Sequence, residues 1–213
     1  MRLIVAVTGA SGVEMSLSLV RALKSCYRLT DGTEEQGTAK QPVPCEIHLI
    51  LSEGAKLTWQ YEGREPIEEL TELCDHVYDE EDLAAVISSG SFVTDGMIVM
   101  PCSMKTLAGI VTGYAENLIQ RAADICMKEN RRIVLVPREM PLSKLHLRNL
   151  AAAADLGCTV VPPMLTFYSG QKTLQDEIDQ VVGKVLLQFG LGSDRFRAWK
   201  GTMPPECGEN RTE

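Results

Sequence analysis

The chain opens with an apolar segment, residues 2–7, that runs directly into Thr8-Gly9-Ala10-Ser11-Gly12. The small side chains of this loop let a ligand approach backbone N–H groups, and apolar residues at helical spacing follow. Such a loop fits a phosphate or an electron-rich ring. It is neither the GxGxxG dinucleotide fingerprint nor a Walker P-loop. A tight strand-to-helix turn without a ligand is the alternative interpretation.

Polar residues also follow three later apolar segments. They are Ser52, then Ser103, Met104, Lys105 and Thr106, and then Arg138 and Glu139. Ser52 fits simple helix capping, whereas the loop after Ser103 offers hydroxyls, amides and a cation at a helix start. Pro137 and Pro141 stiffen the loop that carries Arg138. Because these strand ends converge on one edge of a sheet, they predict a site for a small phosphorylated ligand.

The elements that position these residues alternate along the chain. Short apolar strands are predicted over residues 2–7, 45–51, 96–100, 132–136 and 158–161. Helical patterns cover residues 117–128, 143–156 and 173–189, and Thr173 and Asp176 form a plausible capping pair. This alternation predicts an α/β domain of the Rossmann/flavodoxin-like kind, a parallel sheet with helices on both faces. One domain over residues 1–201 and a flexible tail over 202–213 are expected.

Composition narrows the functional classes. The 213 residues carry a net charge of −8, which disfavours nucleic acid or an anionic membrane as the partner. No apolar run is long enough to span a bilayer, and no signal peptide is recognised. Seven dispersed cysteines predict reduced thiols in a cytoplasmic protein. Ten acidic residues between positions 62 and 82 predict a solvated helical face, and His48, His76 and His146 are interpreted as structural or surface residues.

Several motifs resemble those of one known family, the UbiX/Pad1 flavin prenyltransferases, over roughly residues 2–201. The motifs are Thr8-Gly-Ala-Ser-Gly12, Ser88-Ser-Gly-Ser91, Pro101-Cys-Ser103 with Thr106-Leu107, Asn117-Leu-Ile, Arg121-Ala-Ala-Asp124, Lys128-Glu129, Val134-Leu-Val-Pro-Arg-Glu139, Phe167-Tyr168 and Arg-Ala-Trp199. The resemblance implies a flavodoxin-like Rossmann domain in trimers, often dodecamers, with active sites at subunit interfaces. It implies transfer of a dimethylallyl group from dimethylallyl phosphate to N5 of reduced FMN, ring closure at C6, and no metal. The product, prenylated FMN, would serve a UbiD-type decarboxylase.

The resemblance also implies roles for individual residues. Those implied to contact FMN are Gly9, Ala10, Ser11, Ser52, Ser103, Met104, Lys105, Thr106 and Arg138. Those implied to surround the prenyl phosphate are Arg121, Lys128, Arg138, Tyr168 and Lys184. Those implied to take part in catalysis are Ser11, Glu62, Lys128, Glu139 and Trp199. For Glu139 two roles stay open, acid–base chemistry and simply holding Arg138.

Four departures and three alternatives accompany this resemblance. The family usually has Arg at the position of Lys184, Ser-Lys-Ala-Ala where this chain has Ser52-Glu53-Gly54-Ala55, and a Tyr-Gly pair where it has Glu14-Met15-Ser16. The polar segment 28–44, predicted as an exposed loop, is longer than usual. One alternative is an FMN-dependent cysteine decarboxylase of the HFCD type, although its PASANT-like loop reads Pro101-Cys-Ser-Met-Lys-Thr here. The others are an aromatic acid decarboxylase and a non-catalytic FMN carrier for a partner decarboxylase.

Overall fold

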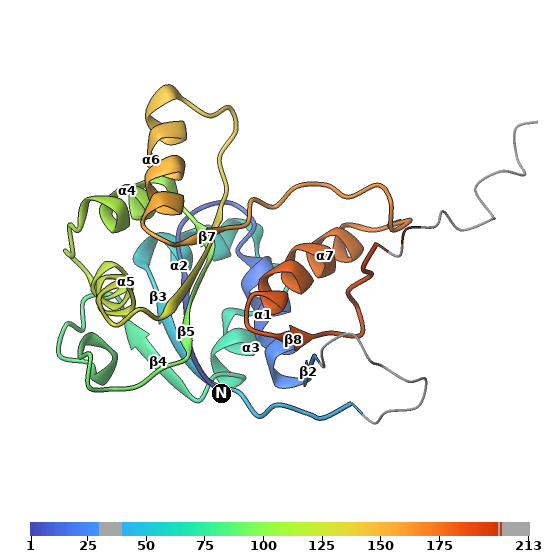
Figure 1. Cartoon of the computed structure of the whole chain (residues 1–213), viewed down its shortest axis with the longest axis horizontal. Coiled ribbons are helices and arrows are strands. Elements are labelled where there is room, and N and C mark those ends of the chain that lie inside the picture. Colours follow the sequence, from blue (N-terminus) through green and yellow to red (C-terminus); the bar gives the residue numbers. More distant parts are fainter. Residues whose placement is uncertain (30–39, 200, 202–213) are drawn as a thin grey trace, which may run out of the picture.

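The computed structural model describes residues 1–29, 40–199 and 201, and its centre is a six-stranded parallel sheet (Figure 1). The strands follow the order β4 (His76–Asp79), β3 (Glu46–Leu51), β1 (Arg2–Val7), β5 (Gly96–Cys102), β6 (Arg132–Pro137) and β7 (Thr159–Val160). The chain therefore winds outward from β1 first in one direction and then in the other, as in doubly wound Rossmann folds. The predicted α/β class is confirmed.

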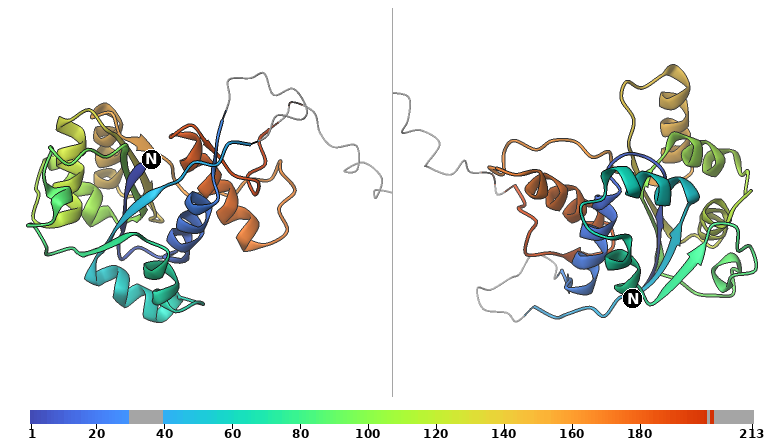
Figure 2. Two further views of the ribbon diagram at one scale, coloured as in Figure 1. Left: turned by 90° about the horizontal axis from the view of Figure 1, so that it is seen from below. Right: turned by 180° about the vertical axis from the view of Figure 1, so that it is seen from behind.

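Helices cover both faces of the sheet (Figures 1 and 2). On one face lie α1 (Glu14–Lys24), α2 (Glu53–Glu62), α3 (Ile67–Glu72) and α7 (Leu174–Leu187). On the other face lie α4 (Met104–Thr112), α5 (Leu118–Lys128) and the short 3-10 helix η1 (Val86–Ser88). A separate antiparallel pair joins β2 (Tyr27–Arg28) to β8 (Leu191–Gly192). The helices predicted over 117–128 and 173–189 correspond to α5 and α7.

Two apolar cores lie on either side of the sheet, and β1 contributes to both. Leu3, Val5 and Val7 point into the core beneath α1 and α7. Ile4 and Ala6 point into the core beneath α4 and α5. A strand covered on both faces must be apolar at nearly every position, which is why the sequence pattern located β1, β3, β5 and β6 within a few residues.

The acidic segment between residues 62 and 82 differs from the expected helical face. Helix α2 ends at Glu62, α3 occupies only Ile67–Glu72, and β4 follows as a strand parallel to β3. Because β4 is the outermost strand of the sheet, its residues need not form the apolar run by which the other strands were recognised. The prediction of a continuous helical face here was wrong.

Helix α6 (Lys144–Asp155) projects past the edge at which the strands end, as Figure 1 and the right view of Figure 2 show. Of its twelve residues only Ala153 is buried. Leu145 on this helix is 61 % exposed, and Met140 in the loop before it is 82 % exposed. Within the described part of the chain, nothing covers these apolar side chains.

Two predicted segments fall on residues that the structure does not describe. They are residues 30–39 of the predicted 28–44 loop and the predicted 202–213 tail.

The predictions on cysteines and membrane spans can be compared with the described residues. All six cysteines that the structure describes are free thiols, and the Sγ atoms of Cys26 and Cys45 lie 3.6 Å apart. No described helix has both the length and the apolar content needed to cross a membrane.

Candidate active site

The candidate site lies between the ends of β1 and β5, where the strand order reverses. Thr8 follows β1 directly and is 1 % exposed. Its hydroxyl donates to the Pro101 carbonyl at 2.8 Å and accepts from the Ser103 N–H at 2.8 Å. Ligands of doubly wound sheets bind at such a switch point. Thr8 therefore joins the two loops that would hold a ligand there.

The glycine-rich loop after Thr8 lies against the start of α2. A Cβ atom on Gly9 would lie 2.9 Å from the backbone carbon of Gly54, so the two backbones meet without side chains between them. Among the described residues, no hydrogen bond uses the N–H groups of Ala10 and Ser11. No side-chain oxygen caps α1 at Val13 either. The loop thus offers backbone donors at a helix start, as an anionic group requires.

Glu62 reaches this loop from the last residue of α2. Its Oε2 atom accepts a hydrogen bond from the Gly12 N–H at 2.7 Å. Gly12 has a φ of +93°, which a glycine adopts without the steric cost that other residues incur. The carboxylate to which the family resemblance gives a catalytic role therefore lies beside the glycine-rich loop.

Two serines after the neighbouring strands act as helix caps. The Oγ atom of Ser52 accepts from the Ala55 N–H at 3.0 Å at the start of α2. Ser103 does the same for α4, accepting from the Thr106 N–H at 3.2 Å. The capping interpretation of Ser52 is confirmed. Met104, Lys105 and Thr106 form the first turn of α4, so the FMN-contacting residues implied by the resemblance, apart from Arg138, gather around the ends of β1, β3 and β5.

Arg138 and Glu139 lie where β6 ends. The Arg138 N–H donates to the Cys102 carbonyl at 3.1 Å, which ties this loop to the end of β5. The Glu139 carboxylate accepts from the Met140 N–H at 3.0 Å, and both side chains are exposed. No ion pair joins Arg138 to Glu139 in the described structure, so the role of Glu139 as a holder of Arg138 has no support within one chain.

The residues implied to surround the prenyl phosphate are dispersed in a single chain. Arg121 pairs with Asp124 at 2.7 Å on α5, and Lys128 pairs with Glu129 at the end of that helix. Lys184 lies on α7, on the opposite face of the sheet, with its Nζ atom 5.5 Å from the centre of the Phe196 ring. One chain by itself does not bring these cations together around a phosphate.

An aromatic pair joins the segments before and after α7. The rings of Tyr168 and Trp199 meet edge to face, with centroids 5.6 Å apart and planes at 82°. Both rings are partly exposed, so each has a face available to another molecule. Tyr168 and Trp199, to which the family resemblance gives different roles, are therefore neighbours.

Three features of the site bear on what sequence reasoning could find. The bridging role of Thr8 and the close approach of Gly54 to Gly9 were not predicted, because both depend on contacts between distant segments. The interpretation of Cys102 as no nucleophile gains support, since burial raises the pKa of its thiol to about 12 and keeps it neutral.

Comparison with known proteins shows one family to which this chain is similar over most of its length. The family model "Flavoprotein" matches residues 1–189. A probable UbiX-like flavin prenyltransferase of Sedimentibacter hydroxybenzoicus is 52 % identical over 95 % of this chain and 98 % of its own.

Two solved structures are also similar over most of the chain. A dodecameric FMN-dependent UbiX-like decarboxylase from Escherichia coli O157:H7 is 46 % identical with a TM-score of 0.83, covering 94 % of this chain and 100 % of its own. AnUbiX (PadA1) in complex with FMN and dimethylallyl pyrophosphate is 40 % identical with a TM-score of 0.84, covering 94 % and 98 %. The peptidyl-cysteine decarboxylase EpiD, 17 % identical with a TM-score of 0.55, shares the fold alone.

Proposed function

The chain belongs to the UbiX-like flavin prenyltransferases, and from this premise we propose that it transfers a dimethylallyl group from dimethylallyl phosphate to N5 and C6 of reduced FMN. The observation that carries the proposal is the set of loops at the switch point, joined by Thr8 and bordered by Glu62. Relatives named as flavin prenyltransferases align over nearly the whole chain. One FMN-binding domain over residues 1–201 accounts for these features.

FMN fits the loops after β1, β3 and β5. The free N–H groups of Ala10 and Ser11 can donate to the flavin, and Ser52 and Ser103 present hydroxyls from the adjacent strand ends. Bound there, reduced FMN supplies the nucleophilic nitrogen and the aromatic carbon that accept the prenyl group. Ser11 orients the ring and exchanges a proton at its hydroxyl.

We place the prenyl-phosphate site between copies of the chain. Arg121 and Lys128 lie on one face of the sheet and Lys184 on the other, so a shared pocket requires residues from neighbouring subunits. The exposed apolar side chains of α6 support an assembly of this kind, because large unpartnered apolar surfaces mark protein–protein contacts. A homotrimer, extended to a dodecamer as in the Escherichia coli O157:H7 relative, is the proposed assembly.

Within that pocket, each type of side chain has a task. Lysine and arginine donors stabilise the negative charge that develops on phosphate as the allylic C–O bond breaks. The rings of Tyr168 and Trp199 offer faces to the allylic cation, which aromatic faces attract. Glu62 and Glu139 are carboxylates that can accept or return the proton released when the flavin is alkylated. Lys184 keeps the charge of the family's arginine but cannot bind phosphate in its bidentate manner.

The direct test is an anaerobic incubation of the protein with reduced FMN and dimethylallyl phosphate, followed by mass spectrometry of the flavin. We expect the flavin to gain one isoprene unit. An unchanged flavin, alongside an active control enzyme, would favour a decarboxylase or a non-catalytic FMN carrier. Decarboxylation is then tested separately with aromatic acids and cysteine-containing peptides.

A single substitution tests the placement of the phosphate. Lys128→Ala should impair prenyl transfer while oxidised FMN stays bound, since Lys128 lies on α5 away from the flavin loops. Lys40→Ala, a surface change beside β2, is the matched control and should retain full activity. Loss of FMN with normal turnover per bound flavin would contradict the role given to Lys128.

Two further parts of the proposal concern the cell. We propose that the prenylated FMN is passed to a UbiD-type decarboxylase. We also propose a cytoplasmic location, which the free thiols of the described cysteines support.

A further inference from the structure

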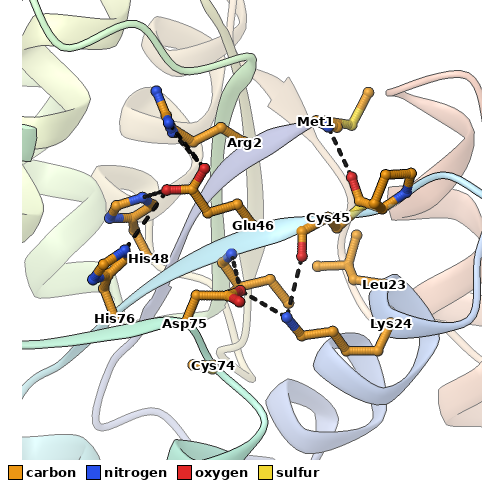
Figure 3. A network of polar contacts seen from close by, with 12 residues as sticks. Met1, Arg2, Leu23, Lys24, Cys45, Glu46, His48, Cys74, Asp75 and His76 are labelled. Carbon is orange, nitrogen blue, oxygen red and sulfur yellow. Dashed lines mark hydrogen bonds and ion pairs between the residues drawn. The ribbon is translucent and has the colours of Figure 1, made fainter.

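Glu46, His48 and His76 cluster at the edge of the sheet opposite to the candidate active site. Glu46 and His48 lie in the first half of β3 and His76 begins β4, whereas the active-site loops follow the last residues of their strands. His48 and His76 are register partners across the two strands, so the sheet places their side chains on one face. Figure 3 shows the Glu46 carboxylate directed at both imidazole rings.

The two distances from the carboxylate oxygen to the imidazole nitrogens are close to those between ligand atoms around a tetrahedral metal ion. Glu46 Oε1 lies 3.0 Å from His48 Nε2 and 3.7 Å from His76 Nε2, and all three donor atoms lie within 4.8 Å of one another. Two ligand atoms that each lie about 2.0–2.1 Å from a tetrahedral Zn²⁺ are about 3.3–3.4 Å apart. The two measured separations bracket this value.

One adjustment is needed to bring both nitrogens onto one ion. The two rings stack with centroids 4.5 Å apart and planes at 21°, whereas a bound metal lies near the plane of each imidazole ring. The side chain of His76 is 52 % exposed and can turn about its own bonds. The side chain of His48 is 1 % exposed and cannot turn freely. His48 would therefore fix the position of the ion, and the exposed ring of His76 would turn to bind it.

Neighbouring groups already orient the donors. The Nδ1 atom of His48 lies 2.9 Å from the Tyr78 hydroxyl, which is the outer hydrogen bond that metal-binding histidines usually make. Arg2 holds Glu46 through Oε2, with its Nε and Nη2 atoms both at 2.9 Å. The other carboxylate oxygen, Oε1, is therefore the one presented to the two imidazoles.

We propose that Glu46, His48 and His76 bind one divalent transition-metal ion, for which Zn²⁺ is the best match, and that the ion fastens the edge strand β4 to β3. Two imidazole nitrogens and one carboxylate oxygen are ligands that Zn²⁺ accepts, with water in the fourth position. Glu46 also lines an open groove of about 580 Å³ beside the cluster, and the exposed side chain of His76 leaves the donor atoms accessible from solvent.

This ion takes no part in prenyl transfer. His48 and Ser52, which lies at the candidate active site, are four positions apart along extended chain, a distance of about 13 Å. The proposal therefore stands apart from the proposed function, and its test needs neither flavin nor prenyl donor.

The test uses the tag-free, full-length protein after removal of metals with a chelator. Equilibrium dialysis against Zn²⁺, with metal content measured by mass spectrometry, should give one ion per chain in the wild type. His76→Ala should lose this ion, and because His76 is exposed the variant should fold. Zn²⁺ should raise the melting temperature of the wild type but not that of His76→Ala.

Two variants sharpen the test. His146→Ala, at the start of α6, removes a histidine outside the cluster and should keep the ion. Tyr78→Phe removes only the outer hydrogen bond and should weaken Zn²⁺ binding by about 10- to 100-fold. The proposal is overturned if the wild type takes up no Zn²⁺, if His76→Ala retains it, or if His146→Ala loses it to the same extent.

Discussion

Replacing Thr8 by valine removes a hydroxyl without changing the shape of the side chain, and it tests whether the two switch-point loops depend on each other. Thr8 is buried and makes two hydrogen bonds of 2.8 Å, one to each side of the Pro101–Ser103 turn. Each bond contributes about 0.5–1.5 kcal/mol net, and a stranded buried N–H costs about 1–3 kcal/mol. Pro101 keeps its second donor, the Thr8 N–H at 3.3 Å, whereas Ser103 keeps none. We therefore expect a loss of about 2–4 kcal/mol in the free energy of unfolding.

Urea unfolding at a fixed protein concentration measures this loss. With a slope of about 2 kcal/mol per molar urea, the midpoint should fall by about 1–2 M. Thr112→Val removes an exposed hydroxyl that bonds only to its own helix, so its midpoint should shift little. The FMN dissociation constant should rise for Thr8→Val and stay constant for Thr112→Val. A Thr8→Val protein with the wild-type midpoint and wild-type FMN affinity would refute the coupling of the two loops.

Two more expectations concern the loop and the buried histidine. A Cβ atom added by Gly9→Ala would lie 2.9 Å from the backbone carbon of Gly54, so the flavin loop should shift and FMN binding weaken by roughly 1 kcal/mol, or about fivefold, in a fluorescence titration. Gly113 has a φ of +70° and open space around it, so Gly113→Ala should cost about 1 kcal/mol of stability and leave the FMN affinity unchanged. An equal loss of FMN affinity in both variants would contradict this account. Burial lowers the pKa of His48 below its ordinary value of 6.5, although the hydrogen bond with Glu46 acts in the other direction. The contribution of the neutral His48 to stability is therefore complete above pH 6.5 and declines as the pH falls through the lowered pKa. In chelator-containing buffer, His48→Gln should therefore lose less stability than the wild type between pH 7.5 and 5.5. An equal pH dependence of stability in His48→Gln and His146→Gln would argue against this role of His48.

Sequence patterns located the strands that are buried on both faces of the sheet. Strands β1, β3, β5 and β6 are covered on both faces, so each is a short apolar run bounded by polar residues. The predicted capping pair of α7 is also present, because Thr173 accepts from the Asp176 N–H and Asp176 accepts from Thr173. Strand β4 was missed because its stability comes from pairing with β3 at the sheet edge, which leaves no periodic signature in a segment rich in carboxylates.

The candidate site was predictable only in part, for a different reason. Parallel strands end at the same edge of a sheet. The small and hydroxyl residues after β1, β3 and β5 could therefore be assigned to that edge from the sequence alone. The contact of Glu62 with Gly12 and that of Gly9 with Gly54 join residues about 45–50 positions apart, and no local pattern specifies them. The cations Arg121, Lys128 and Lys184 lie on opposite faces of the sheet, so a pattern within one chain could not show which of them meet.

The two outermost strands of the sheet are short, four residues in β4 and two in β7. A strand this brief presents few unpaired backbone groups to a passing chain, so neither margin can serve as a template on which further strands would grow. In the part of the chain that the structure describes, contacts between copies are therefore expected to use helices and side chains and not an extension of the sheet. Short outer strands therefore protect the folded protein against edge-to-edge aggregation into fibres.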